Sequence, residues 1–559
     1  MYDIVIRGGT LIDGSGARAV EADVAIDGAR ITAVGREVGR GKREIDARGQ
    51  LVTPGFVDVH THYDAQATWD AELTPSIWHG VTTVVMGSCG VGFAPARPDR
   101  HEWLINLMEG VEDIPGAALS EGIKWGWESF PEYLDVLERL PHALDIGTQL
   151  AHGPLRAYVM GERGAANEPA TADDVAQMAL LLRQGLEAGA LGFSTSRTML
   201  HKANDGRPVP GTFADRNELF GLGRALRDAN AGVFQIAGEH ASMPEELDWI
   251  EALAHEIGRP VTFNLSQIDQ SPELWRKLIE RLDRTTAPMH AQVAGRAIGL
   301  IMSFDGSAHP FLAYPSFHGV PREALRDDPA VREKILGETP LDLGEFANFI
   351  ARSYDKMFIV RDVPDYEPPP ESSVAAMAAR AGVRPEAMAY DHLAAGGNLY
   401  FPLFNYAGGD LDVVRALHMH PRTVMGLGDA GAHCGVIADG GIPTFMLTHW
   451  TRDRTRGAMM PIEHVIHRQT RATATLFGLH DRGLVAPGMK ADIAVFDHGK
   501  LALGPAHIVH DLPAGGRRLI QRASGYSATL VSGTVIVEND TPTGARPGKL
   551  VRGAQASAR

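Results

Sequence analysis

Disulfide bonds and membrane-spanning segments are the first features that this sequence excludes. Its 559 residues include only 2 cysteines, Cys89 and Cys434, which is too few for a disulfide framework and typical of a reducing compartment. No apolar run reaches the roughly 18 residues of a membrane-spanning helix. The opening segment, MYDIVIRGGT, lacks the basic and apolar regions of a secretory signal. We therefore expect a cytoplasmic protein that makes no membrane contact.

Positive charge is also in short supply. Lys and Arg number 53 against 69 Asp and Glu, a net charge of −16, which argues against nucleic acid or an anionic membrane as the main partner. The sequence contains no phosphate loop of the form GxxxxGK[ST] and no GxSxG nucleophile motif. With 44% hydrophobic and 22% charged residues, the chain has the composition of a folded enzyme or scaffold.

Both ends of the chain show the alternation and turn residues of short antiparallel strands. We expect strands at residues 2–7, 22–26, 492–496, 528–531 and 534–537. Neither end has enough strands for a stable sandwich of its own. We therefore expect residues 1–54 and 484–559 to combine into one small composite β-sandwich.

The region between the ends, residues 55–483, alternates apolar strands with amphipathic helices, the pattern of parallel βα units. The candidate strands are residues 55–62, 81–86, 144–150, 190–194, 232–236, 261–265, 289–293 and 424–428. Eight such units predict an α/β fold of the (β/α)₈ TIM-barrel type, with the chemistry on the loops that follow the strands. A long insertion at about residues 303–420 would then form a lid over that face.

The segment Pro54–His62, PGFVDVHTH, carries the sharpest chemical signal. Residues two apart on a strand face the same side, so His60 and His62 project together from the end of the first barrel strand. Such a pair suits zinc or a similar divalent ion, although a His-x-His pair can also be purely structural. Asp429 ends the eighth strand, which neighbours the first across the barrel closure. It could ligate the ion and carry a proton, or merely cap a helix.

Other candidates lie on neighbouring loops. Cys89 follows the second strand and is either a buried apolar residue or, beside a cation, a thiolate ligand. His152, after the third strand, is either a substrate-binding or a structural residue, and His240, three residues past the fifth, is either a metal ligand or a structural residue. Arg156 and Arg296 could bind a substrate carboxylate.

Several motifs together resemble the amidohydrolase superfamily, and within it the N-acyl-D-amino-acid deacylase (D-aminoacylase) branch. The resemblance covers almost the whole chain, and GSCG and HGPLRAYVMG favour the deacylase branch. The matching segments are DIVIRGGTLIDGSG, ADVAIDGARITAVG, LVTPGFVDVHTHYD, GVTTVVMGSCGVGFAP, AHGPLRAYVMG, GALGFSTS, GLGDAGAH, RGLVAPGMKADIAVFD and VSGTVIVENDTPTGARPG.

The resemblance implies a metal-dependent barrel that hydrolyses N-acyl-D-amino acids to a carboxylate and a free D-amino acid. It places metal ligands on His60, His62 and Cys89 and the general acid/base on Asp429. The deacylase pattern also has histidines at the ends of strands five and six, whereas residues 233–237 and 263–267 contain none. One zinc ion is therefore preferred, and two are possible if His240 supplies a ligand.

Two alternatives stay open at this point. The same barrel could hydrolyse a cyclic amide, a lactone or a small xenobiotic amide, because fold does not determine substrate. The absence of histidines from strands five and six would also be consistent with a metal-free scaffold. The presence of His60, His62, Cys89 and Asp429 argues against it. In the enzymatic interpretation the partner is a small-molecule amide, and the chain could form a homo-oligomer.

Overall fold

A parallel α/β barrel forms the centre of the computed structural model, which describes residues 1–556. Its strands are paired in parallel from one to the next, in agreement with the predicted order. They are β6 (Phe56–Asp58), β7 (Val81–Met86), β8 (Asp145–Thr148) continued by β9 (Leu150–Ala151), β10 (Gly192–Ser196), β11 (Val233–Ala237), β12 (Val261–Asn264), β13 (Met289–Val293) and β17 (Thr423–Met425). The predicted α/β barrel is confirmed.

The barrel closes between β6 and β17, just beyond the ends of both strands. The backbone N–H of Asp429 donates to the carbonyl of His60 at 3.1 Å, and the N–H of His62 donates to the carbonyl of Ala430 at 2.8 Å. A parallel bridge between Thr61 and Ala430 lies at the same place. The first and eighth strands are therefore neighbours, as the sequence predicted.

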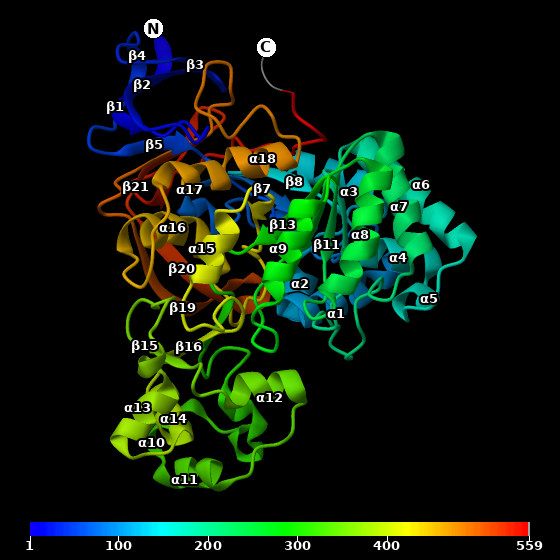
Figure 1. Cartoon of the computed structure of the whole chain (residues 1–559), viewed down its shortest axis with the longest axis vertical. Coiled ribbons are helices and arrows are strands. Elements are labelled where there is room, and N and C mark those ends of the chain that lie inside the picture. The colour runs from blue at the N-terminus through cyan, green and yellow to red at the C-terminus, as the bar shows by residue number, and fades with distance from the viewer. Residues whose placement is uncertain (557–559) are drawn as a thin grey trace.

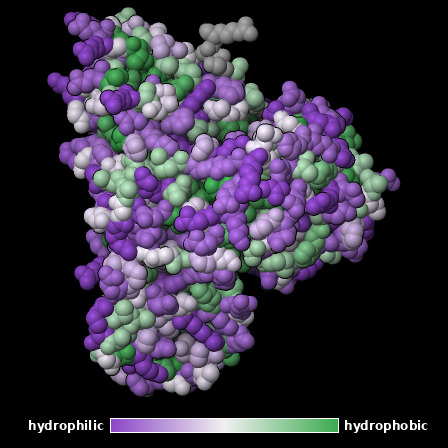
Figure 2. Space-filling view, in the orientation of Figure 1, coloured by the Kyte–Doolittle hydropathy of each residue, from purple (hydrophilic) through white to green (hydrophobic). Residues whose placement is uncertain are grey.

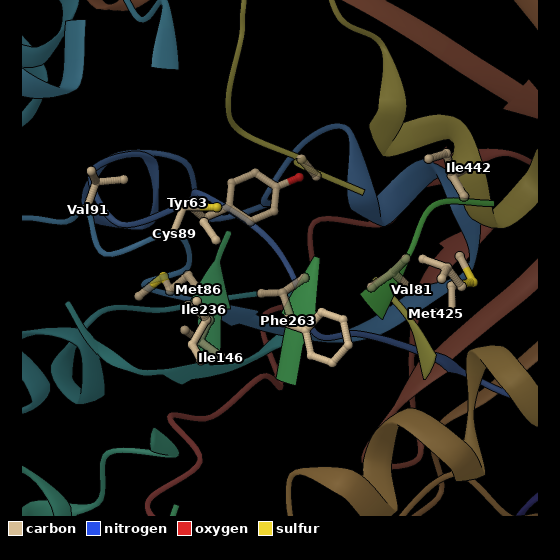
Figure 3. Close-up of a cluster of buried hydrophobic side chains, with 14 of the residues drawn as sticks. Tyr63, Val81, Met86, Cys89, Val91, Ile146, Ile236, Phe263, Met425 and Ile442 are labelled. Carbon is tan, nitrogen blue, oxygen red and sulfur yellow. The ribbon is translucent and has the colours of Figure 1, made fainter. Parts of the chain in front are cut away.

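Amphipathic helices cover the outside of the barrel (Figure 1). They include α6 (Ala172–Ala188), α7 (Arg216–Ala229), α8 (Met243–Ile257) and α9 (Leu274–Arg284). Their starts follow from local sequence: Thr171 and Asp174 form a reciprocal capping box on α6, and the Asp215 side chain caps α7. Apolar side chains of the strands pack with those of the helices in one large buried cluster. Figure 3 shows part of this cluster, including Met86, Ile146, Ile236 and Phe263.

The two ends of the chain share one sheet, which confirms the predicted composite β domain. The order is β23-β22-β21-β18-β5-β1-β2-β3, with β4 also paired to β1. These strands are β1 (Tyr2–Leu11), β2 (Val20–Asp27), β3 (Arg30–Gly35), β4 (Gly41–Asp46), β5 (Leu51–Pro54), β18 (Ile493–Phe496), β21 (Tyr526–Val531), β22 (Thr534–Glu538) and β23 (Thr541–Pro542). The antiparallel pairing of β5 with β18 joins the N-terminal part to the C-terminal part.

Two C-terminal segments lie outside this sheet. The hairpin of β19 (Ala502–Leu512) and β20 (Gly516–Ser524) forms a separate two-stranded sheet. Residues 548–555 return to the barrel, where the N–H of Val551 donates to the carbonyl of Ile146 at 2.7 Å. The predicted domain boundaries themselves stay a prediction.

The insertion forms a lobe of its own at the lower end of the view in Figure 1. A three-stranded antiparallel sheet of β14 (Gly299–Met302), β16 (Asn398–Pro402) and β15 (Phe358–Val360) supports it. Its helices are α10 (Arg322–Asp327), α11 (Pro329–Gly337), α12 (Glu345–Arg352), α13 (Val374–Ala381) and α14 (Pro385–Ala394). A separate apolar cluster around Phe304, Phe311 and Tyr390 packs inside the lobe.

The surface visible in Figure 2 is largely hydrophilic, with apolar side chains scattered over it. Within residues 1–556 no helix combines the length and the apolar character needed to cross a membrane.

Buried charges join the barrel to the terminal sheet. The Asp145 carboxylate, on β8, accepts from Nη1 of Arg482 and Nζ of Lys490, each at 2.6 Å, and from the N–H of Lys549 at 2.9 Å. Lys490 also bonds Asp492, next to β18, at 2.9 Å. Burial raises the pKa of Asp145, but the nearby Lys490 and Arg482 outweigh this and lower it overall.

Replacement of Asp145 by Asn should destabilise the fold, because Arg482 and Lys490 would stay buried without their shared counter-charge. We expect a loss of about 3–5 kcal/mol in the free energy of unfolding, measured by chemical denaturation. The control is Glu187→Gln, which breaks an exposed pair with Arg183 at 3.7 Å and should cost less than about 1 kcal/mol. Equal effects of the two changes would contradict this role for Asp145.

Candidate metal centre and active site

His60, His62 and Cys89 converge at the ends of β6 and β7. Their ligand atoms all lie within 4.8 Å of one another, and all three side chains are buried. Nε2 of His60 lies 3.2 Å from Sγ of Cys89. Burial raises the pKa of the Cys89 thiol, but His60 and His62 outweigh burial and lower it overall. The cluster therefore favours the thiolate, the form that binds metals.

Asp429 joins this group from the other side of the barrel closure. Its Oδ1 lies 3.2 Å from Nε2 of His60 and 3.5 Å from Nε2 of His62. Burial raises the pKa of this carboxyl group, but the two histidines outweigh burial and hold the pKa well below its ordinary value. Asp429 therefore lies against both histidines of the group formed by His60, His62 and Cys89.

This donor set fits a zinc ion. Zinc prefers imidazole nitrogen, thiolate and carboxylate ligands in a tetrahedron, and its bond lengths place neighbouring ligand atoms about 3.4–3.6 Å apart. The separations of His60 from Cys89 and from Asp429, both 3.2 Å, and of His62 from Asp429, 3.5 Å, are close to that value. His60, His62 and Cys89 would therefore hold the ion, with Asp429 beside the two histidines.

Three polar side chains that the sequence analysis did not identify support the histidines. Nδ1 of His60 lies 2.6 Å from Oε1 of Gln292, on β13, and 3.1 Å from Nε2 of Gln235, on β11. Glu112, the last residue of α1 (His101–Glu112), places Oε1 3.1 Å from Nδ1 of His62. The amide oxygen of Gln292 favours a proton on Nδ1 of His60 and leaves its Nε2 free as a ligand, and the Glu112 carboxylate places a negative charge beside His62. Every second residue of a barrel strand faces the interior, and this rule could have identified the two glutamines from the sequence. No local motif identifies Glu112.

Several residues of the site have an unusual backbone conformation. Cys89, Leu427, Asp429 and His433 have φ of 56°, 55°, 43° and 49°, in the left-handed region that residues other than glycine rarely adopt. Such conformations cost of order 1–3 kcal/mol each and are found mainly where the surrounding structure requires them. Three of the four follow β17, so the turn that presents Asp429 is held in place by its neighbours.

A cavity of about 500 Å³ opens beside the four ligands. His240 lies on its wall, with its ring 4.9 Å from the ring of Phe404, and is outside the ligand group. His201, which the sequence analysis did not identify, also lines the cavity. Its Nδ1 lies 3.0 Å from Oγ of Ser196, and burial lowers its pKa to about 3, so it is a neutral side chain at pH 7.

The three predicted substrate-binding residues lie elsewhere, in buried networks. Glu218 bonds both His152, at 2.9 Å, and Nε of Arg156, at 2.8 Å. Arg296 donates to Asp439 at 2.7 Å and lies over the ring of Tyr366 at 3.6 Å. None of the three lines the cavity. We therefore leave them out of the substrate site, because they do not line the cavity and the two arginines are paired with buried carboxylates.

The fold and this metal-type centre define a barrel hydrolase of the amidohydrolase type. A family model described as "Amidohydrolase family" matches residues 43–537, and the chain belongs to that family. The chain is similar to D-aminoacylase from Alcaligenes xylosoxydans xylosoxydans, with 27% identity over 98% of this chain and 97% of that protein. It is also 27% identical to N-acyl-D-glutamate deacylase from the same organism, over 98% and 96% of the two chains. The resemblance drawn from the sequence motifs is confirmed.

Solved structures show the same fold. A crystal structure of D-aminoacylase matches with a TM-score of 0.66 and 24% identity, over 99% of this chain and 100% of that chain. An N-acyl-D-glutamate deacylase from Bordetella bronchiseptica, in complex with zinc and a phosphonate inhibitor, matches with a TM-score of 0.66 and 23% identity, over 99% of each chain.

The protein purified without chelators should contain about one zinc ion per chain, as expected for one tetrahedral ligand set. The double change His60→Ala with His62→Ala should abolish this content, measured by mass spectrometry of the metal. A matched double change at the exposed His255 and His510 should leave it intact. Wild-type protein that neither contains nor takes up metal would contradict the centre.

Glu112→Gln should weaken zinc affinity by about 10–100-fold, because the change keeps the side chain's shape but removes the charge beside His62. Competition with a chelator measures this. Glu102→Gln, at an exposed position on the same helix, is the control and should leave affinity unchanged. Unaltered affinity in Glu112→Gln would show that the carboxylate has no part in holding the ligand.

Proposed function

We propose that this protein is a zinc-dependent hydrolase that cleaves the amide bond of N-acyl-D-amino acids or of their close derivatives. The group of His60, His62 and Cys89, with Asp429 against both histidines, carries the proposal, because a protein without metal chemistry has no need of such a ligand set. The relatives that span the whole chain support the substrate class, since they include D-aminoacylase, N-acyl-D-aspartate deacylase and N-acyl-D-glutamate deacylase.

In the proposed reaction the scissile amide of the substrate binds in the cavity next to Asp429. A zinc ion held by His60, His62 and Cys89 would keep one position open for water or substrate, and it would supply a Lewis acid that polarises a carbonyl and makes water a better nucleophile at neutral pH. Asp429, held as a carboxylate by the two histidines, accepts a proton from the attacking water. It then returns this proton to the departing nitrogen, because an amine anion is too poor a leaving group. Of its side chain, 13% is exposed, so Asp429 faces the cavity as well as the ligands.

The direct test is an assay of zinc-loaded protein on a panel of matched compounds. N-acyl-D-amino acids and their amides should be cleaved, their L enantiomers less well, and cyclic imides and lactones not at all. If only the cyclic compounds were hydrolysed, the proposed substrate class would be wrong and the barrel would act on cyclic amides or lactones instead.

Asp429→Asn should lower kcat by about 10²–10⁴-fold, the usual contribution of a positioned acid/base. The zinc content should be retained, because His60, His62 and Cys89 remain as ligands. Steady-state kinetics and metal analysis on the same preparation separate the two effects. Asp305→Asn, at an exposed ion pair on the insertion lobe, should change neither value. Near-native kcat in Asp429→Asn would remove Asp429 from the mechanism.

A further inference from the structure

The cavity beside the metal centre has one large apolar wall. The insertion lobe and the strand ends supply it, mainly through Leu300, Phe346, Ile350, Leu403, Phe404 and Val436. Phe346 and Ile350 come from α12, which brings the lobe to the edge of the site. A volume of about 500 Å³ is ample for an acyl chain or an aromatic side chain. This wall would bind apolar groups of a substrate.

Another part of the cavity lining is acidic. Besides Glu112 and Asp429, the cavity is lined by Glu109 and Asp113 at the end of α1. Glu109 accepts from the N–H of Gly116 at 2.8 Å and from Asn204 at 2.6 Å, and Asp113 accepts from the N–H of Gly435 at 2.9 Å. These donors are uncharged, so they satisfy the oxygens without cancelling the negative charge.

No lysine or arginine within residues 1–556 lines this cavity. Arg197, next to the lining residue Thr198, is paired with Glu246 at 3.1 Å, and Lys356 of the lobe is paired with Asp269 at 2.6 Å. Lys202 follows His201, but its side chain is exposed and lies outside the lining. Apart from the proposed zinc ion, the cavity therefore offers no lysine or arginine to a substrate carboxylate, although carboxylates in proteins are typically bound by such groups.

We propose that the substrate of this site carries no free carboxylate, and that it is an apolar acyl amide of a D-amino compound whose carboxyl group is masked as an amide or ester. The inference rests on the proposed hydrolase function and narrows its substrate class. In a partly desolvated cavity the carboxylates of the lining repel the carboxylate of a substrate at short range. A neutral carboxamide can instead donate a hydrogen bond to them.

A matched pair of compounds tests the proposal. N-octanoyl-D-phenylalanine and N-octanoyl-D-phenylalaninamide differ only in the charge of one group, and octanoate release reports cleavage of the same bond in both. With zinc-loaded wild type we expect kcat/KM for N-octanoyl-D-phenylalaninamide to exceed that for N-octanoyl-D-phenylalanine at least tenfold. Most of this difference should be a higher KM for the acid. The gap should narrow as salt is raised from low to high concentration, because ions screen the repulsion.

The possible failures are distinguishable. Equal or better cleavage of the acid overturns the charge inference and leaves the hydrolase function standing. Cleavage of neither compound counts against the proposed function, and binding of the two compounds measured by calorimetry then decides the inference by itself. Tighter binding of the acid overturns it, and tighter binding of the amide supports it.

Adding a cation to the wall gives an independent check. Phe346→Lys places an ammonium group at a partly exposed position that lines the cavity, and it should raise kcat/KM for the acid relative to the amide several-fold. Phe213→Lys makes the same change at an exposed position outside the lining and should leave the ratio unchanged. A ratio that moves equally in both variants, or in neither, overturns the proposal.

Discussion

The closure of the barrel between β6 and β17 is the constraint on which the site depends. The hydrogen bonds from Asp429 to the carbonyl of His60 and from His62 to that of Ala430 set the register of the first and eighth strand ends. Side chains on a strand alternate between faces, so a shift of one residue would turn the Asp429 carboxylate away from the histidines. Leu427, Asp429 and His433 adopt left-handed conformations after β17. These allow the chain to turn sharply and present Asp429 while its backbone stays bonded to that of His60.

Polar groups from distant parts of the chain support this arrangement. Gln235 and Gln292 reach Nδ1 of His60 from two other strands, and Glu112 approaches His62 from a helix that follows β7. At the other side of the barrel, Asp145 binds Arg482 and Lys490 and so fastens the barrel to the sheet that both termini build. Buried charges of this kind are costly to break, because each one left without its partner remains desolvated.

The barrel and the insertion lobe contribute differently to function. The barrel core is one continuous apolar cluster that positions the ligands, whereas the lobe packs around its own cluster. Side chains of the lobe, among them Phe346 and Phe404, reach the cavity wall without touching the ligand group. In the proposed enzyme the metal chemistry would thereby be separated from the surface that contacts the substrate, as is common for enzymes built on this fold.

The sequence by itself determined the barrel and most of the ligands. Strand and helix periods are local, and His60, His62, Cys89 and Asp429 each follow a recognisable apolar strand, so their common location follows from parallel strands ending at one face. The tertiary structure alone decided the supporting residues and the cavity. Glu112 lies within a helix that carries no motif, and Arg156 and Arg296 resemble substrate ligands until their partners, Glu218 and Asp439, are seen. The partner of a charge depends on packing between segments far apart in the chain, 62 residues for Arg156 and 143 for Arg296, and no local pattern records such packing.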